Sequence, residues 1–210
     1  MIYLSIDIET TGLDPKIHSI IELAAILDNN SEVLAEKLPY LRLLIPSRSG
    51  DYNVSAKCLE MHKFLWPKLN LGREALISEQ SHIETKPLGP YEIMYSDCDV
   101  DDLSTRACYP DRIVDSLMWW LQKEQNIKEK LTIAGKNYAL FDRLFIPGID
   151  RLPAHRRILD PGPMYVTIND REVPSMQECL NRANLIQTKG HTAYGDALDV
   201  VNLIRAKLNY

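Results

Sequence analysis

The sequence predicts an α/β domain with a mixed central β-sheet, an antiparallel hairpin plus parallel strands, flanked by helices. Apolar and polar residues alternate through the first nine positions, a period of two that is typical of a strand. Two strand-like segments follow and form a hairpin, and after them short apolar strands alternate with amphipathic helices. A hairpin followed by this alternation indicates a sheet with both antiparallel and parallel neighbours.

The first half of the chain supplies the hairpin. Asp and Asn residues at 28–31 interrupt the apolar pattern and favour a turn between two strands. Ser55 precedes a stretch of helical spacing and is of the residue type that caps helix N-termini. The strands predicted in this half are 2–9, 19–28 and 33–46, and the predicted helix is 54–65.

The second half supplies the alternating elements. From residue 66 to about 108 the periodicity fades and three prolines and two glycines occur, so we expect an irregular insertion (66–108) within a single domain spanning 1–210. Order returns in an amphipathic helix over 111–124. The later elements are predicted as strands at 131–134 and 157–159 and as helices at 138–145, 174–184 and 192–208.

The composition limits the kinds of protein that this chain can be. Its 210 residues, 45% apolar and 25% charged, suit one globular domain. No stretch approaches the ~20 apolar residues of a membrane span, the N-terminus lacks the basic region of a secretory signal, and the four cysteines show no CxxC. We therefore expect a cytoplasmic protein without membrane contact. The net charge of −5 disfavours a basic coat for long nucleic acid, but not nucleic acid held at a small metal site.

Two carboxylates lie two residues apart in the first predicted strand. Asp7 and Glu9 should project from the same face of the sheet, because side chains at i and i+2 share a face. Two ionised carboxylates on a mostly covered face repel each other and lose hydration, so an uncompensated pair is costly. A divalent cation is the natural compensation, and the pair therefore resembles half of a metal site.

Two helical acids are candidates for the other half. Asp142 and Asp196 lie on apolar stripes that should face the core, although a lone acid there is more typical of a cap or of a partner for a buried arginine. Combined with Asp7 and Glu9, they form an oxygen-only set that suits Mg²⁺ or Mn²⁺. His191 lies five residues before Asp196, in the predicted loop that enters the last helix, from where it could reach a metal-bound water.

The segments that carry these residues resemble the motifs of a known family. The three exonuclease motifs of the DEDD superfamily are matched, in order, by 7–12 (Asp-Ile-Glu-Thr-Thr-Gly), 137–142 (Asn-Tyr-Ala-Leu-Phe-Asp) and 191–197 (His-Thr-Ala-Tyr-Gly-Asp-Ala). The His-x4-Asp form of the third motif resembles the histidine (DEDDh) branch, which includes RNase T, oligoribonuclease and the proofreading subunit of bacterial DNA polymerase III. The resemblance implies an RNase H-like fold. The chain differs from many members in having Lys136 where they carry His.

The resemblance also implies an activity, that of a 3′-to-5′ exonuclease releasing nucleoside 5′-monophosphates from the 3′ ends of single-stranded or short DNA or RNA. Two divalent cations, Mg²⁺ or Mn²⁺, would clamp the terminal phosphodiester. Asp7 would bridge both ions, and the other three acids would complete their ligand shells. His191 would remove a proton from the attacking water as general base, a role that suits the ordinary histidine pKa of ~6.5.

Substrate contacts follow from the same resemblance. Relatives place contacts to the 3′-terminal nucleotide at the positions of Thr10, Thr11 and Leu13. His62 resembles part of a short element that lies near the terminal base, although a packed helix end explains it equally well. Asn137 either fixes its loop or touches the substrate.

Several alternatives stay open. Glu22, inside the second apolar strand, is more typical of a hydrogen-bonded structural acid than of a fifth ligand. A polymerase-associated proofreading enzyme is the main alternative; because the chain ends at Tyr210, directly after the last predicted helix, we expect a free-standing enzyme. The insertion could still dock a polymerase, and a homodimer stays open too. A non-catalytic nucleic-acid-binding module would predict degraded motifs, whereas the acids and the histidine are all present.

Overall fold

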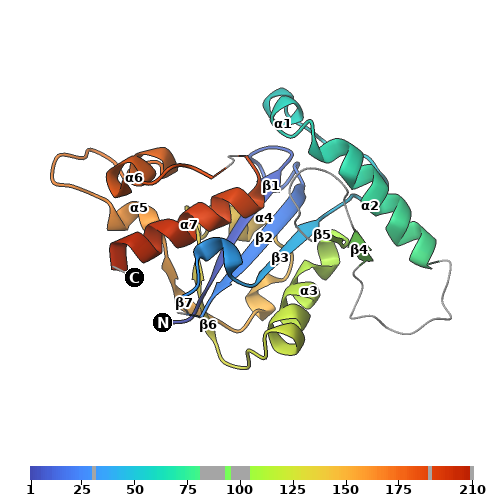
Figure 1. The fold of residues 1–210 in the computed structure, drawn as a ribbon. Helices are drawn as coiled ribbons and strands as arrows, with labels where there is room; N and C mark the ends of the chain where they lie inside the picture. Colours follow the sequence, from blue (N-terminus) through green and yellow to red (C-terminus); the bar gives the residue numbers. More distant parts are fainter. Residues whose placement is uncertain (30–31, 81–92, 96–104, 189–190, 209–210) are drawn as a thin grey trace.

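A seven-stranded mixed sheet in the order β4-β5-β3-β2-β1-β6-β7 forms the centre of the molecule (Figure 1). The computed structural model describes residues 1–29, 32–80, 93–95, 105–188 and 191–208. The β2 strand pairs antiparallel with both β1 and β3, whereas β6 runs parallel to β1 and β7, so the predicted mixed sheet is confirmed. The strands are β1 (Tyr3–Thr10), β2 (Ile20–Asp28), β3 (Tyr40–Leu44), β4 (Ile93–Tyr95), β5 (Thr105–Ala107), β6 (Leu131–Ala134) and β7 (Ala154–Leu159).

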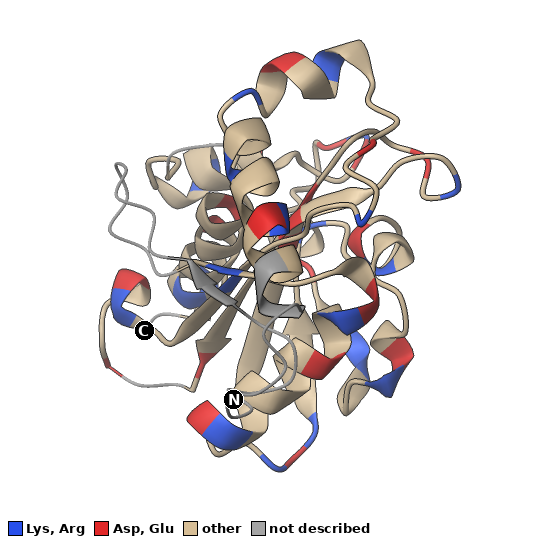
Figure 2. Cartoon of the chain, turned by 90° about the vertical axis from the view of Figure 1, so that its right-hand side faces the viewer, with Lys and Arg blue, Asp and Glu red and all other residues tan. Residues whose placement is uncertain are grey.

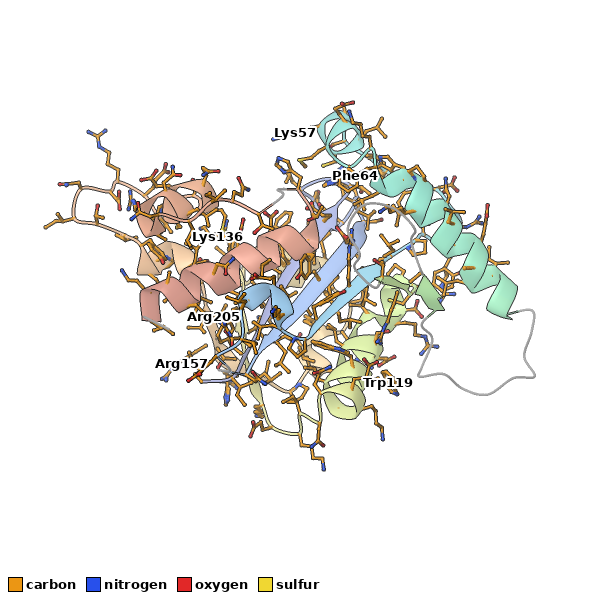
Figure 3. The ribbon with its side chains drawn as sticks, viewed as in Figure 1. Lys57, Phe64, Trp119, Lys136, Arg157 and Arg205 are labelled. Atoms are coloured by element: carbon orange, nitrogen blue, oxygen red, sulfur yellow. The ribbon has the colours of Figure 1, made fainter. Side chains whose placement is uncertain are left out.

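Helices cover both faces of the sheet (Figure 1). On one face α7 packs on β1 and β2 around Tyr3 and Val200, and on the other α3 packs around Leu117. Arg205 of α7 binds the buried Asp28 of β2, with Nε 2.7 Å from Oδ2, and so holds this helix along the strand (Figure 3). The helices are α1 (Ala56–Met61), α2 (Leu65–Gln80), α3 (Ile113–Trp119), α4 (Asp142–Phe145), α5 (Pro161–Met164), α6 (Met176–Ala183) and α7 (Ala193–Leu208).

The alternation in β1 decides which side chains meet α7. Leu4 and Ile6 belong to the apolar cluster on the α3 face, whereas Tyr3 belongs to the cluster on the α7 face. Because side chains two residues apart share a face, Asp7 and Glu9 lie on the α7 side together with Tyr3. The sequence pattern therefore directs both carboxylates toward the helix that carries Asp196.

The predicted irregular insertion at 66–108 is wrong for its first part, because Leu65–Gln80 form the helix α2. Pro67 lies in the first turn, where a missing backbone N–H costs no hydrogen bond. Leu65 and Leu69, four residues apart, are buried and pack on the sheet. Two short strands, β4 and β5, then extend the sheet beyond β3. Residues 81–92 and 96–104 of the predicted insertion lie outside the described residues.

Other elements differ from the prediction mainly in length. The third strand begins only at Tyr40, because Ala35–Lys37 form a 3₁₀ turn. The segment predicted as a helix at 138–145 is helical only over α4. The cap predicted at Ser55 is confirmed, since its Oγ accepts from the Cys58 N–H at 3.3 Å.

The surface of the described elements mixes charges of both signs. In the view of Figure 2, Lys and Arg segments alternate with Asp and Glu segments over helices and loops. Within the part of the chain that the structure describes, no helix has the length and apolar character needed to cross a membrane.

Candidate metal centre

Three of the predicted acids lie together where β1 meets the start of α7. Asp7, Glu9 and Asp196 each offer a carboxylate oxygen, and these atoms lie within 4.8 Å of one another. Ser5, on the same side of β1, donates its hydroxyl to the backbone oxygen of Ala197 at 2.9 Å and fixes the helix over the strand. Strand alternation and this contact thus bring together acids from opposite ends of the sequence.

Asp142 lies beside this cluster but is not part of the compact group of three. It is the first residue of α4 and is only 3% exposed. Its charge is the largest of the neighbouring charges that raise the pKa of Asp7 in β1. The fourth predicted ligand therefore approaches the same strand from another helix.

The carboxyl groups of the cluster hold protons more tightly than ordinary carboxyl groups. Burial, the largest cause, and the charges of neighbouring acids raise the pKa of Asp7 well above its usual range and that of Glu9 to about 9. The same causes raise the pKa of Asp196 to about 6, and burial above all raises that of Asp142 to about 7. A divalent cation would relieve this repulsion, and an all-oxygen donor set is what Mg²⁺ and Mn²⁺ prefer. The donor set thus fits the ions that the sequence predicted.

His191 lies at the entrance of α7, as the sequence predicted. Its φ of +65° is in the left-handed region, which few residues other than glycine adopt. The side chain is exposed, and its charge partly offsets the rise that burial causes in the pKa of Asp196, which indicates that the ring lies near this carboxylate. This placement is compatible with proton transfer at the cluster, and the role as base stays a prediction.

Glu22 has a structural partner, which is the reading that the sequence favoured. It lies opposite Glu9 in the register of β1 and β2. The buried Arg42 of β3 donates from Nε to Oε1 of Glu22 at 2.5 Å, and Oε2 accepts from the backbone N–H of Ala193 at 3.1 Å. The charge of Glu22 is thus compensated by arginine, and its carboxylate ties β2 to the start of α7.

The structure places His62 against Glu9, a contact that the sequence did not reveal. The Nε2 atom of His62 lies 3.3 Å from Oε2 of Glu9, and the imidazole is only 1% exposed. Burial lowers the pKa of His62, which favours a neutral ring that donates from Nε2 to the carboxylate. Groups that hydrogen-bond a metal-ligating carboxylate fix its orientation and raise metal affinity. His62 is packed at the C-terminal end of α1 against Glu9, and a contact with the terminal base stays a prediction.

Replacing His62 with alanine should weaken Mn²⁺ binding by about 10- to 100-fold, because Glu9 would lose the donor that orients it. His62→Gln, whose amide can donate from a similar position, should retain most of the affinity. Isothermal titration calorimetry at pH 8 measures both variants, and Lys63→Ala is the control, since Lys63 is exposed and pairs with the exposed Glu60. Equal affinity of His62→Ala and the unmodified protein would contradict the assigned role.

Thr10 and Thr11 hold the loop between β1 and β2. The hydroxyl of Thr10 donates to the backbone oxygen of Gly12 at 2.8 Å, and that of Thr11 accepts from the Ser19 N–H at 2.9 Å. Both threonines are buried, whereas the Leu13 side chain is 81% exposed. Of the three predicted substrate contacts in this loop, Leu13 is the one whose side chain is open to a ligand.

Asn137 fixes its own loop, the first of its two predicted roles. It adopts a φ of +60°, and its backbone N–H donates to Oδ2 of Asp160 at 3.0 Å. The Oδ1 atom of Asp160 accepts from the Gly162 N–H at 2.8 Å and caps α5, while Nζ of the neighbouring Lys136 lies 3.9 Å away (Figure 3). A contact between Asn137 and substrate stays a prediction.

Comparison with solved structures shows the fold of the DEDDh exonucleases. Cell-death related nuclease 4 (CRN-4) is matched with a TM-score of 0.62 at 10% identity, over 99% of this chain and 64% of that one. The nuclease domain of 3′hExo, a DEDDh family member bound to rAMP, is matched with a TM-score of 0.59 at 13% sequence identity, over 99% of this chain and 92% of that one. E. coli exonuclease I in complex with a dT13 oligonucleotide is matched with a TM-score of 0.53 at 16% sequence identity, over 99% of this chain and 40% of that one.

These matches extend over nearly the whole chain, but this chain spans less than two thirds of CRN-4 and well under half of exonuclease I. No protein-family model matches the sequence, and no curated protein matches it. At sequence identities this low, the matches show only that this chain shares the fold of these proteins. The predicted RNase H-like fold of the DEDDh type is thus confirmed.

Proposed function

From the DEDDh exonuclease fold and the acidic cluster, we propose that this protein is a metal-dependent 3′-to-5′ exonuclease acting on single-stranded or short nucleic acid. The observation that carries the proposal is the group formed by Asp7, Glu9 and Asp196, whose ligand oxygens lie within 4.8 Å of one another. The fold relatives support the substrate class, since 3′hExo is seen with rAMP and exonuclease I with dT13.

The carboxylates would hold the cations of the reaction. Asp7, Glu9 and Asp196 would bind Mg²⁺ or Mn²⁺, with Asp142 adding a ligand from α4. When bound, such ions lower the pKa of a water and stabilise charge on the phosphate and on the leaving 3′ oxygen. A chelator should therefore abolish turnover and weaken substrate binding, because no cation is then present to hold the phosphodiester.

His191 would act as the general base. A base must lie within hydrogen-bond reach of the water whose proton it takes, directly or through one further water. The exposed ring beside Asp196 supports this role, and its contact with solvent would let the proton leave after the attack. Water adds to the terminal phosphorus, the 3′ oxygen of the preceding nucleotide leaves, and a nucleoside 5′-monophosphate is released.

A nuclease assay tests the proposal. RNA and single-stranded DNA oligonucleotides of matched sequence and several lengths, labelled at the 5′ end, are incubated with Mg²⁺, with Mn²⁺ or with EDTA. We expect a ladder that shortens from the 3′ end, nucleoside 5′-monophosphates as products, and no reaction in EDTA.

The other possible functions give different outcomes in the same assay. Full-length substrate that persists under every condition contradicts the exonuclease, and oligonucleotide binding without hydrolysis indicates a binding module. With primer–template duplexes added as substrates, a strong preference for a mismatched 3′ end over a paired one favours proofreading.

A further inference from the structure

We infer that Asp199 is a positioning residue that holds the segment carrying His191 in place through Thr188; the inference rests on the proposed function. Oδ1 of Asp199 accepts two hydrogen bonds from Thr188, one from the backbone N–H at 3.0 Å and one from the hydroxyl at 2.6 Å. The Asp199 side chain is fully buried in α7. Neither residue belongs to the acidic cluster.

The segment that carries His191 is attached to α7 on both sides. Thr188, three residues before His191, is tied to Asp199. Thr192, the residue after it, accepts from the Gly195 N–H through its hydroxyl and from the Asp196 N–H through its backbone oxygen, both at 3.1 Å. The helix that supplies a carboxylate of the cluster therefore also anchors Thr188 and Thr192, which lie on either side of the proposed base. Residues 189 and 190 lie outside the described residues.

Two observations indicate that this attachment has a use. A non-glycine residue at a φ of +65° keeps that conformation only where its surroundings fix it, and His191 is such a residue. A buried carboxylate is costly unless it is well hydrogen-bonded, yet Oδ2 of Asp199 has no partner among the described residues. Thr188 is the partner that the Asp199 carboxylate has, so holding this segment is the role that its contacts support.

Thr188→Val tests the tether without changing a charge near Asp196. Loss of the hydroxyl should reduce kcat about tenfold, because a hydrogen bond to a carboxylate is lost and His191 is less often in place. KM and Mn²⁺ affinity should not change. Thr188→Ser preserves the hydroxyl donor and should retain the activity. Thr167→Val, which removes a hydroxyl near Asp170 in another loop, is the matched control and should have no effect.

A double-mutant cycle separates positioning from general structure. In a His191→Ala background, Thr188→Val should have no further effect on kcat, because both changes act through the same imidazole. A tenfold loss that persists in that background overturns the inference, as does an unchanged kcat of the single variant. If the unmodified protein hydrolyses no nucleic acid, amide hydrogen exchange still decides: faster exchange confined to 185–192 in Thr188→Val supports the tether, and unchanged exchange overturns it.

Discussion

Asp7→Asn is expected to reduce nuclease turnover by at least about 10³-fold, because this carboxylate lies in the compact group proposed to bind the cations. An amide keeps the size of the side chain but carries no charge and is a weaker ligand for a hard cation. The loss should appear in kcat at saturating Mg²⁺, and single-turnover cleavage of a labelled oligonucleotide measures it.

The same variant should remain folded. Burial and four neighbouring acids raise the pKa of Asp7 well above its usual range, so the cation-free protein gains little from this ionised carboxylate. Its free energy of unfolding in EDTA, from urea titration, should equal or exceed that of the unmodified protein. Asp51→Asn, which removes an exposed carboxylate, is the control and should alter neither activity nor stability. Near-normal turnover of Asp7→Asn would show that the metal-site assignment is wrong.

The stability of the cation-free protein should fall as pH rises. The pKa of Glu9 is raised from 4.5 to about 9, that of Asp142 to about 7 and that of Asp196 to about 6. A carboxyl group whose pKa is raised by folding binds its proton more tightly in the folded state, so its stabilising contribution is complete below the unfolded pKa and is lost as pH passes the folded pKa. The free energy of unfolding in EDTA should therefore decrease between pH 5 and pH 9, by up to about 1.4 kcal/mol per pH unit for each proton involved.

Divalent cations should reverse this trend. Ions bind the deprotonated cluster, so the increase in stability caused by 10 mM Mg²⁺ or 1 mM Mn²⁺ should be larger at pH 8 than at pH 6. Glu9→Gln removes the group whose pKa is about 9 and should flatten the EDTA profile above pH 7. Urea unfolding at each pH provides the data. A profile in EDTA that is flat from pH 5 to pH 9 would contradict the crowded, cation-dependent cluster.

Much of the candidate site follows from local patterns. The alternation in β1 was enough to predict that Asp7 and Glu9 share a face, and the helical stripe around Asp196 was enough to predict that it faces the sheet. These predictions depend only on the period of a strand or a helix. The cap at Ser55 followed from its residue type alone.

Contacts between distant segments could not be predicted in this way. The pairs His62–Glu9 and Asp199–Thr188 arise from packing of separate elements, and no periodicity marks them. Helix α2 was not predicted because the prolines and glycines of 66–108 favour irregular structure, although Pro67 lies in the first turn of α2, where proline is tolerated. The four-residue spacing of Leu65 and Leu69 is the sequence signal for this helix, and both side chains are buried.

The threonines of the first motif show a further limit. The family resemblance predicts substrate contacts at Thr10 and Thr11, and this stays a prediction; the structure shows that their hydroxyls also bond within the β1–β2 loop. A motif identifies a position without stating whether its residue shapes the backbone, touches a ligand or does both.

Crystals grown with Mn²⁺ and a nucleoside 5′-monophosphate test the central claim most directly, because anomalous scattering locates each ion without reference to activity. The account predicts Mn²⁺ in contact with carboxylate oxygens of Asp7, Glu9 and Asp196, with the phosphate of the nucleotide on the open side of the ions. The same crystals of Asp7→Asn should lose this density. The account would be contradicted if the acidic cluster held no Mn²⁺ in crystals grown at millimolar Mn²⁺, or if Mn²⁺ were bound only elsewhere on the protein.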